Sequence, residues 1–479
     1  MAMQAKYRDR MSEREFDVVV LGAGPAGEVC AGRLGEAGLE VAIVEPHLIG
    51  GECSFYACMP SKALLRPGEL LAEVRRIPGV REVVTSDLDV EAVLKRRDEI
   101  IHGLDDTHMV PWLEKRGVTV VRLAGRLEAE RRVRVGDDTL VARRAVVVAT
   151  GSAPLIPPID GLREAKPWTN REATTAKQIP DRLAILGGGV VGVEMAQGYS
   201  ALGSQVSLIE RGDRLIPREE PFASDDVRES LSEKGVDVRL GVSATSVQTD
   251  GGDVTVELDD GGPVRADELL VAIGRRLNTD DIGLETVGLE PGEAVHVDSS
   301  MRADGSDWLY AIGDANGRAL LTHMGKYHAR IAADSILGVE TGCLPINGIG
   351  SRSPRVIFTD PHVAAVGYTM DAARQDGLNV RAVDVPTQAN AGASFYGRDD
   401  ARGTTRLVID DDRRIIVGAT FTGPEIAEFL HAATICVVAE VPIDRLFHAI
   451  PAFPTRSEVW LYLGEALGIA GPCGGPQRA

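Results

Sequence analysis

The chain has 479 residues, 53 of them glycine, and a formal net charge of −19. Its length predicts about three domains, each able to bury its own core. The negative charge argues against a nucleic-acid partner, no apolar run approaches the roughly 18 residues needed to span a bilayer, and six cysteines in so long a chain argue against a disulfide scaffold.

The first 15 residues are polar and carry both positive and negative charges. They lack the apolar core of a signal peptide. We therefore expect a disordered N-terminal tail and a cytoplasmic protein.

The first predicted element is a short apolar strand over residues 16–21, typical of a buried parallel strand. The glycine-rich turn 22–27 follows directly, then a helical pattern to Gly38 and a second apolar strand, 41–45, that ends in an acid. In such a unit the first glycine makes the turn and the second lets the backbone approach a pyrophosphate. The third allows close helix packing, and the acid binds a ribose hydroxyl.

Cys53 and Cys58 come next, and Met-Pro-Ser-Lys follows at residues 59–62. Pro60 suits the first turn of a helix, where its missing N–H costs nothing. The positive end of the helix dipole would stabilise a thiolate at Cys58. The pattern indicates a redox disulfide that passes electrons on by thiol–disulfide exchange, and two buried structural cysteines are the alternative.

The strand–turn–helix–strand unit occurs a second time, with a glycine-rich turn at residues 187–192. The first glycine and the acid are 23 residues apart in both copies, Gly22 to Glu45 and Gly187 to Glu210. A single glycine-rich turn is a weak signal, but two copies with the same flanking strands and spacing predict two dinucleotide sites.

Apolar strands that run into glycine close each unit, at residues 145–151 and 269–274. A further strand, 309–312, leads into Gly313 and Asp314, whose carboxylate is a candidate for binding the ribityl hydroxyls of a flavin. In the final third, strands at 405–409 and 414–418 predict a hairpin, and a helix is expected from about residue 424 to 440.

These motifs, in this order, resemble the flavoprotein disulfide reductases, which include dihydrolipoamide dehydrogenase, glutathione and mycothione reductases, and mercuric reductase. The matching segments are GAGPAG at 22–27, GGxCxxxxCxPSK at 50–62, ATG at 149–151, GGGVVG at 187–192, AIGRRLNT at 272–279, AIGDAN at 311–316 and PRVIFTDPHVAAVGY at 354–368. The resemblance covers nearly the whole chain. It implies an α/β fold with two Rossmann-like dinucleotide-binding domains, for FAD and NAD, and a C-terminal α+β dimerisation domain.

The resemblance also implies domain boundaries. They are a disordered tail over 1–15, an FAD-binding domain over 16–153 and 277–347, an NAD(P)-binding domain over 154–276, a dimerisation domain over 348–470 and a flexible tail over 471–479. In related enzymes the last domain forms a homodimer, and each active site is completed by the C-terminal segment of the partner chain.

Site residues carry over from the family position by position. FAD would be bound by Gly22, Gly24, Pro25, Ala26, Gly27, Glu45, Gly51, Lys62, Thr150, Gly151 and Asp314. NAD would be bound by Gly187, Gly189, Gly192, Glu210 and Gly274. No metal site is implied. The acid at Glu210 suits the free ribose diol of NADH and would repel the 2′-phosphate of NADPH, so NADH is the expected donor although Arg211 follows directly.

The resemblance implies a catalytic relay as well. Cys58 would hold a thiolate against the flavin and Cys53 would attack the substrate. Lys62 would lie near the flavin N5 and pair with Glu194, although without the family both would read as ordinary charged residues.

One position departs from the family. The C-terminal segment of related enzymes contains His-Pro-Thr-x-x-Glu, in which the histidine shuttles protons. Here Glu458 is present, but Phe453 occupies the histidine position and His448 stands too early to replace it. A lost acid–base group typically costs about 10²–10⁴-fold in rate. The alternative is a purely structural change in which Phe453 is a core residue. A second departure is His362, which stands where related enzymes are expected to have an acid.

The sequence therefore predicts an NADH-dependent FAD oxidoreductase that passes hydride through the flavin to a disulfide between Cys53 and Cys58, and on to a small-molecule disulfide. A quinone or dye reductase acting from the flavin, a soft-metal-ion reductase of the mercuric type and a flavoprotein subunit kept for assembly into a complex are the alternatives.

Overall fold

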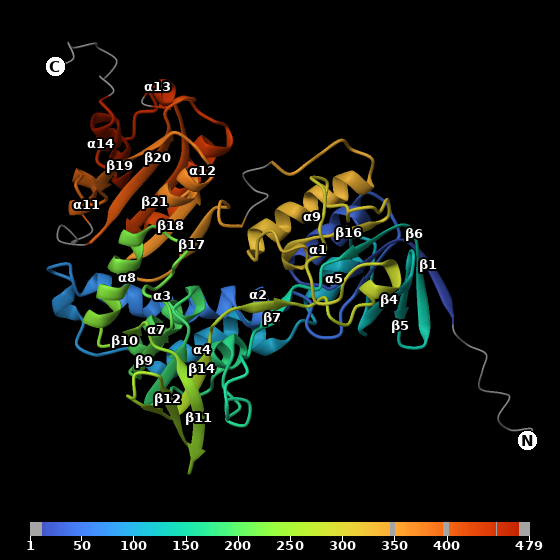
Figure 1. Cartoon of the computed structure of the whole chain (residues 1–479), viewed down its shortest axis with the longest axis horizontal. Coiled ribbons are helices and arrows are strands. Elements are labelled where there is room, and N and C mark those ends of the chain that lie inside the picture. Colours follow the sequence, from blue (N-terminus) through green and yellow to red (C-terminus); the bar gives the residue numbers. More distant parts are fainter. Residues whose placement is uncertain (1–11, 345–349, 396–401, 447, 469–479) are drawn as a thin grey trace, which may run out of the picture. The chain divides into compact units, whose positions relative to one another are not determined.

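The computed structural model describes residues 12–344, 350–395, 402–446 and 448–468. They form two compact units, whose elements are labelled in Figure 1. Unit 1 takes the described parts of Met1–Pro60, Asp98–Pro154 and Arg275–Gly350, and unit 2 takes those of Ser61–Arg97, Leu155–Gly274 and Ser351–Ala479.

Unit 1 is built on a seven-stranded sheet. Its strands are β1 (Glu13–Leu21), β2 (Val41–Val44), β3 (Val118–Val121), β4 (Gly125–Ala129), β5 (Arg132–Val135), β6 (Asp138–Val148) and β16 (Leu309–Ala311). Strands β3, β2, β1 and β6 lie side by side and parallel, β16 joins β6 in parallel, and β5 and β4 extend the sheet in antiparallel pairing. The parallel strands are apolar and buried, as the continuous hydrophobic runs predicted.

Helices cover this sheet and bring its loops together. They are α1 (Pro25–Glu36), α2 (Gly51–Phe55), α5 (Met109–Glu114) and α9 (Thr322–Ile336), with 3₁₀ turns η2 (His102–Leu104), η3 (Leu284–Val287) and η4 (Gly313–Asn316). Helix α1 packs on α9, and α9 packs on η4 (Figure 1). A two-stranded ribbon of β7 (Ser152–Pro154) and β15 (Arg275–Leu277) completes the unit.

Unit 2 contains a second parallel sheet in the order β10, β9, β8, β14. The strands are β8 (Arg182–Leu186), β9 (Gln205–Glu210), β10 (Asp237–Leu240) and β14 (Glu268–Val271), next to an antiparallel sheet of β11 (Ala244–Asp250), β12 (Asp253–Leu258) and β13 (Val264–Ala266). The helices are α3 (Cys58–Val74), which begins in unit 1, α4 (Val90–Ile100), α6 (Asn170–Thr175), α7 (Val190–Ala201), α8 (Pro221–Glu233) and the 3₁₀ turn η1 (Arg81–Val83).

The C-terminal part of unit 2 is a five-stranded antiparallel sheet in the order β17, β18, β21, β20, β19. The strands are β17 (Arg355–Ile357), β18 (His362–Gly367), β19 (Val380–Pro386), β20 (Thr404–Asp410) and β21 (Ile415–Gly423). The helices are α10 (Met370–Gln375), α11 (Ala391–Ser394), α12 (Leu430–Val438), α13 (Ile443–Leu446) and α14 (Val459–Ala466), with η6 (Ile426–Phe429) and η7 (Arg456–Glu458) (Figure 1). The pairing of β20 with β21 confirms the predicted hairpin.

The structure differs from the sequence-based expectations in three places. Strand β1 begins at Glu13, because residues 13–16 pair with the extended β6, so residues 13–15 are strand and not tail. The expected helix from 424 to 440 is a 3₁₀ turn followed by α12, because Glu425 adopts a left-handed φ of 55°. Residues 61–97, expected in the FAD-binding domain, belong to unit 2. In the described part of the chain, no helix is long and apolar enough to cross a membrane.

Candidate active site

The first glycine-rich turn of unit 1 follows β1 and opens α1. Gly22 has a φ of +102°, and a Cβ there would lie 2.4 Å from the Ala149 carbonyl oxygen. A Cβ on Gly27 would lie 1.9 Å from the oxygen of Gly22. Gly24 differs, because a Cβ there would have no neighbour within 4 Å. Packing therefore requires the first and third glycines, whereas the second leaves open space for a ligand.

The second turn, in unit 2, repeats this geometry. A Cβ on Gly187 would lie 2.5 Å from the Ala272 carbonyl oxygen, and one on Gly192 would lie 1.8 Å from the oxygen of Gly187. A Cβ on Gly189 would again meet nothing within 4 Å. Two turns of one design thus lie in separate units.

The two acids that end the second strands are held in the same way. Glu45 accepts the N–H of Ala23 at 2.9 Å and that of His47 at 2.8 Å. Glu210 accepts the N–H of Gly188 at 2.6 Å and that of Gly212 at 2.7 Å. In each copy the donors are the residue after the first glycine and the second residue after the acid. Both carboxylates are therefore fixed beside their turns, where a ribose diol can reach them.

Further predicted FAD residues gather around the first turn. Pro25 is the first residue of α1, and a Cβ on Gly51 would lie 2.8 Å from the Gly24 Cα. The Thr150 hydroxyl is buried and has no partner within the described residues. The open face of Gly24 and this unsatisfied hydroxyl fit a bound dinucleotide.

Three further residues predicted to bind a cofactor are Gly151, Gly274 and Ala26. Gly151 and Gly274 have positive φ and face open space, and Ala26 lies 3.3 Å from where a Cβ on Gly313 would be. Gly151 follows Thr150 directly, Gly274 lies three residues after the end of β14 in unit 2, and Ala26 packs α1 against η4.

Asp314, on η4, is bonded to a residue from β7. The Ser152 hydroxyl donates to its carboxylate at 2.5 Å and accepts from Arg275 Nε at 2.7 Å. Burial raises the pKa of the Asp314 carboxyl, while the hydrogen bond from Ser152 and the charge of Arg275 act in the opposite direction. Sequence reasoning placed Asp314 but missed Ser152 and Arg275, although Arg275 lies in the 272–279 motif.

The two cysteines lie at a junction of two helices. Cys53 is in α2, and Cys58 is the first residue of α3, as predicted. Both are free cysteines, with no disulfide between them. A hydrogen bond with Cys58, together with burial, raises the pKa of Cys53. The proton is therefore retained by Cys53, and the helix dipole acts on Cys58, whose Sγ lies 3.4 Å from Thr322 Oγ1.

Lys62 and Glu194 form the expected ion pair, with Nζ and Oε2 2.7 Å apart. The other oxygen of Glu194 accepts the N–H of Phe358 at 3.0 Å, and Lys62 Nζ lies 4.7 Å from the centroid of the Phe358 ring. Glu194 is buried. The lysine is thus oriented by a carboxylate and a ring, and sequence reasoning missed the ring.

Helix α3 and the residues just after it also contact the start of β18 and the residues that precede it. Glu69 Oε1 lies 3.0 Å from His362 Nε2, and Arg76, just after the helix, lies 3.1 Å from Asp360 Oδ2. Lys62 and Glu69 are seven residues apart, which is two helical turns, and therefore lie on one side of α3. The unexpected His362 is paired with a carboxylate of this helix.

The C-terminal segment does not place Phe453 in the core. Its side chain is 76% exposed, so the packing alternative is wrong for the described chain. Glu458 is buried, and its Oε2 has no hydrogen-bond partner among the described residues. His448 is exposed. The family's carboxylate is thus present without a proton-carrying ring in this segment.

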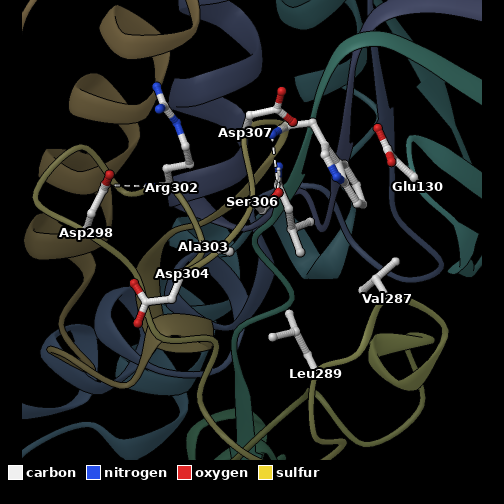
Figure 2. Close-up of a pocket in the computed structure, with 12 residues that line it drawn as sticks. Glu130, Val287, Leu289, Asp298, Arg302, Ala303, Asp304, Ser306 and Asp307 are labelled. Carbon is white, nitrogen blue, oxygen red and sulfur yellow. Dashed lines mark hydrogen bonds between the residues drawn. The ribbon is translucent and has the colours of Figure 1, made fainter.

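A pocket of about 570 Å³ lies elsewhere in unit 1 (Figure 2). Val287, Leu289 and Trp308 form part of its apolar lining, and Asp304 and Asp307 contribute carboxylates. None of the predicted site residues lines it.

Two dinucleotide cradles and a dithiol at a helix start define a flavoprotein disulfide reductase, and comparison with known proteins agrees. Residues 16–330 match the family described as pyridine nucleotide-disulphide oxidoreductase, and residues 353–463 match its dimerisation domain. The chain therefore belongs to the pyridine nucleotide-disulphide oxidoreductase family, as its motifs predicted. It is an oxidoreductase of the FAD-containing, pyridine-nucleotide-using class.

Individual relatives cover nearly all of the chain. Dihydrolipoyl dehydrogenase from Chlamydia muridarum is 31% identical over 452 residues, which is 93% of this chain and 95% of that enzyme. Mercuric reductase from Staphylococcus aureus is 27% identical over 450 residues, which is 93% of this chain and 81% of that enzyme.

Solved structures confirm the predicted fold class. LpdA from Mycobacterium tuberculosis superposes with a TM-score of 0.82 at 25% identity, covering 94% of this chain and 99% of that one. The HOCl-induced flavoprotein disulfide reductase RclA from Escherichia coli superposes with a TM-score of 0.80 at 24% identity, covering 94% and 99%.

Proposed function

We propose that this chain is a dihydrolipoamide dehydrogenase-like reductase that uses NADH to reduce a disulfide substrate through Cys53 and Cys58. The observation that carries the proposal is the pair of neighbouring free thiols that α2 and the first residue of α3 bring together. FAD, bound by the residues around the first glycine-rich turn and Asp314, supplies two-electron transfer between the nicotinamide and the cysteine pair.

The reduced cysteines would act in sequence. Cys53 attacks one sulfur of the substrate disulfide, which forms a mixed disulfide and releases the first thiolate. Cys58 then attacks the sulfur of Cys53, re-forms the protein disulfide and releases the second thiolate. Each leaving thiolate takes up one proton. Lys62, oriented by Glu194, places a positive charge one helical turn after Cys58.

We propose NADH as the donor because of Glu210. Its carboxylate is fixed by two backbone N–H groups beside the second turn, where it can accept hydrogen bonds from a free ribose diol. A 2′-phosphate would meet the same negative charge and be repelled. We also propose a homodimer in which the C-terminal segment of one chain completes the site of the other, in keeping with the matched dimerisation domain.

A second candidate is favoured by Phe453. This exposed ring cannot carry a proton, so an acceptor that needs no imidazole at that position is an alternative. A quinone or dye reduced directly from the flavin is one such acceptor. A soft metal ion held by the thiolates is another, and a mercuric reductase is among the relatives.

One experiment separates these functions. NADH consumption is measured for the wild type and Cys53→Ser, each with lipoamide and with a soluble quinone. We expect lipoamide reduction that Cys53→Ser abolishes. If only quinone is reduced, and equally well by Cys53→Ser, then electrons leave the enzyme directly from the flavin. Hg²⁺ would then be tested as a ligand of the thiol pair.

A further inference from the structure

Hydrogen bonds link Asp314 to Ser152 and Arg275, and an ion pair links Arg275 to Glu52, the residue that precedes Cys53. Ser152 donates to Asp314 at 2.5 Å, and Arg275 donates to Ser152 twice, from Nε to Oγ at 2.7 Å and from Nη2 to the carbonyl oxygen at 2.6 Å. Arg275 Nη2 also lies 3.9 Å from Glu52 Oε2. All four residues belong to unit 1, where they come from β7, β15, η4 and α2.

The arrangement puts one guanidinium between two carboxylates. The charge of Arg275 lowers the pKa of Asp314, and the charge of Glu52 raises it, in addition to the larger effect of burial. The carboxylate form of Asp314 can accept from Ser152 and from a ribityl hydroxyl together. Charge-assisted bonds of this kind are roughly twice as strong as neutral ones.

We propose that Arg275 is a positioning residue for FAD: through Ser152 it orients the Asp314 carboxylate and keeps it charged, and Glu52 opposes it. The proposal rests on the proposed role of Asp314 in binding the ribityl chain. It does not depend on which acceptor the enzyme reduces, so its failure and that of the proposed reaction are distinguishable.

The other groups around Asp314 do not provide this charge. Helix α9 packs on η4 and brings His328, whose Nδ1 lies 3.3 Å from the amide nitrogen of Asn316. Burial lowers the pKa of His328 to about 4, so it is neutral between pH 5 and 8. Among the described residues, Arg275 and Glu52 are the charged side chains that act on the Asp314 carboxyl, Arg275 lowering its pKa and Glu52 raising it.

The test follows FAD release from the holoenzyme by the rise of flavin fluorescence after dilution, at pH values from 5 to 8. In Arg275→Met we expect FAD release to be faster than in the wild type, by about tenfold where the difference is greatest. The difference should grow as the pH falls, because loss of the Arg275 charge raises the pKa of Asp314. In Glu52→Gln we expect the opposite shift, with FAD retained to lower pH.

The matched control is Arg276→Met. Arg276 is the neighbouring residue of β15, but its side chain is more exposed and pairs with Asp280 instead. We expect its release profile to equal that of the wild type. In the double variant Glu52→Gln with Arg275→Met, the profile should move back toward the wild type, which a packing role of Arg275 would not produce.

Two results would overturn the proposal. One is an acceleration in Arg275→Met that is the same at every pH, and the other is a Glu52→Gln profile equal to that of the wild type. If Arg275→Met does not fold, two other variants still test the proposal. Glu52→Gln keeps Arg275 itself, and Arg275→Lys keeps its positive charge. A wild type that holds FAD but reduces no disulfide would contradict only the proposed reaction.

Discussion

At the scale of single residues, the C-terminal segment carries the main difference from related enzymes. Glu458 keeps a buried carboxylate with an unsatisfied oxygen, and Phe453 stands exposed where the family has a histidine. In the proposed pair the carboxylate would orient an imidazole ring. Here the position is occupied by a phenyl ring, which cannot donate or accept a proton. On the proposed assignment, the segment keeps the carboxylate of an acid–base pair and lacks its histidine.

We expect Phe453→His to restore that pair. An acid–base group typically contributes about 10²–10⁴-fold, so kcat for lipoamide should rise at least about tenfold and gain a dependence on pH. Steady-state NADH oxidation measures this. Phe453→Leu is the control and should gain nothing, and Glu458→Gln added to Phe453→His should remove most of the gain. A histidine variant no faster than the leucine variant would contradict the proposed role of the segment.

Glu28 gives a prediction for stability. This residue of α1 is buried, its Oε1 has no partner within the described residues, and burial raises its pKa to about 7. Lys326 opposes this shift and Glu45 adds to it. Because the unfolded state ionises at lower pH, the wild type loses stability as the pH rises from about 4.5 through about 7.

Glu28→Gln removes this ionisation. We expect the variant to match the wild type near pH 4.5 and to exceed it by about 2–3 kcal/mol above pH 8, from urea unfolding of the holoenzyme. Glu36→Gln, on the same helix but exposed and paired with Arg116, should change the unfolding free energy by less than about 1 kcal/mol at every pH. A pH-independent difference for Glu28→Gln would show that its carboxyl is not the titrating group.

At the scale of elements, the two glycine-rich turns separate packing from binding. Gly192 is required by packing, since a Cβ would lie 1.8 Å from a backbone oxygen. Gly189 has a φ of −76° and open space, so alanine fits there without strain. In the proposed NAD site, a pyrophosphate would approach the side of the turn that is left free.

Gly189→Ala should therefore fold normally and bind NADH poorly. We expect a change in unfolding free energy below about 0.5 kcal/mol, unchanged flavin content, and a KM for NADH raised about tenfold, measured by thermal unfolding, flavin absorbance and steady-state kinetics. Gly24→Ala is the matched variant of the first turn and should lower FAD content instead. Equal effects of both variants on NADH alone would contradict the assignment of the two sites.

The sequence was sufficient for features that depend on neighbouring residues. The two turns, their acids and the start of a helix at Cys58 are set by local spacing, and the structure has these features where the sequence predicts them. The contacts of Arg275 were not predictable, because they join residues 52, 152, 275 and 314 through strand pairing and loop packing. Phe358 was missed for the same reason, since its ring meets Lys62 only after β17 and α3 pack in one unit.

At the scale of the whole molecule, two ion pairs with buried carboxylates join the loop before α8 to the C-terminal sheet within unit 2. Glu219, before α8, pairs with Arg355 at 2.6 Å, and Glu220 pairs with Arg406 at 2.9 Å. Ile435, Ile450 and Phe453 of the same unit are exposed. Apolar side chains of this kind, in a domain matched as a dimerisation domain, fit a surface covered by a second copy.

The proposed dimer predicts that two variants, each inactive alone, recover activity when they form heterodimers. Cys53→Ser lacks the attacking thiol, and Phe453→Asp would place a carboxylate beside the partner's thiolate, so we expect each homodimer to be nearly inactive with lipoamide. Mixing the two after mild dissociation should form heterodimers in which one of two sites has both an intact thiol pair and an intact C-terminal segment. Random exchange of subunits would then recover about one quarter of wild-type activity. If each site were built from one chain, both kinds of site would stay damaged and the mixture would remain inactive, which would contradict the shared site while leaving the redox role of Cys53 untouched.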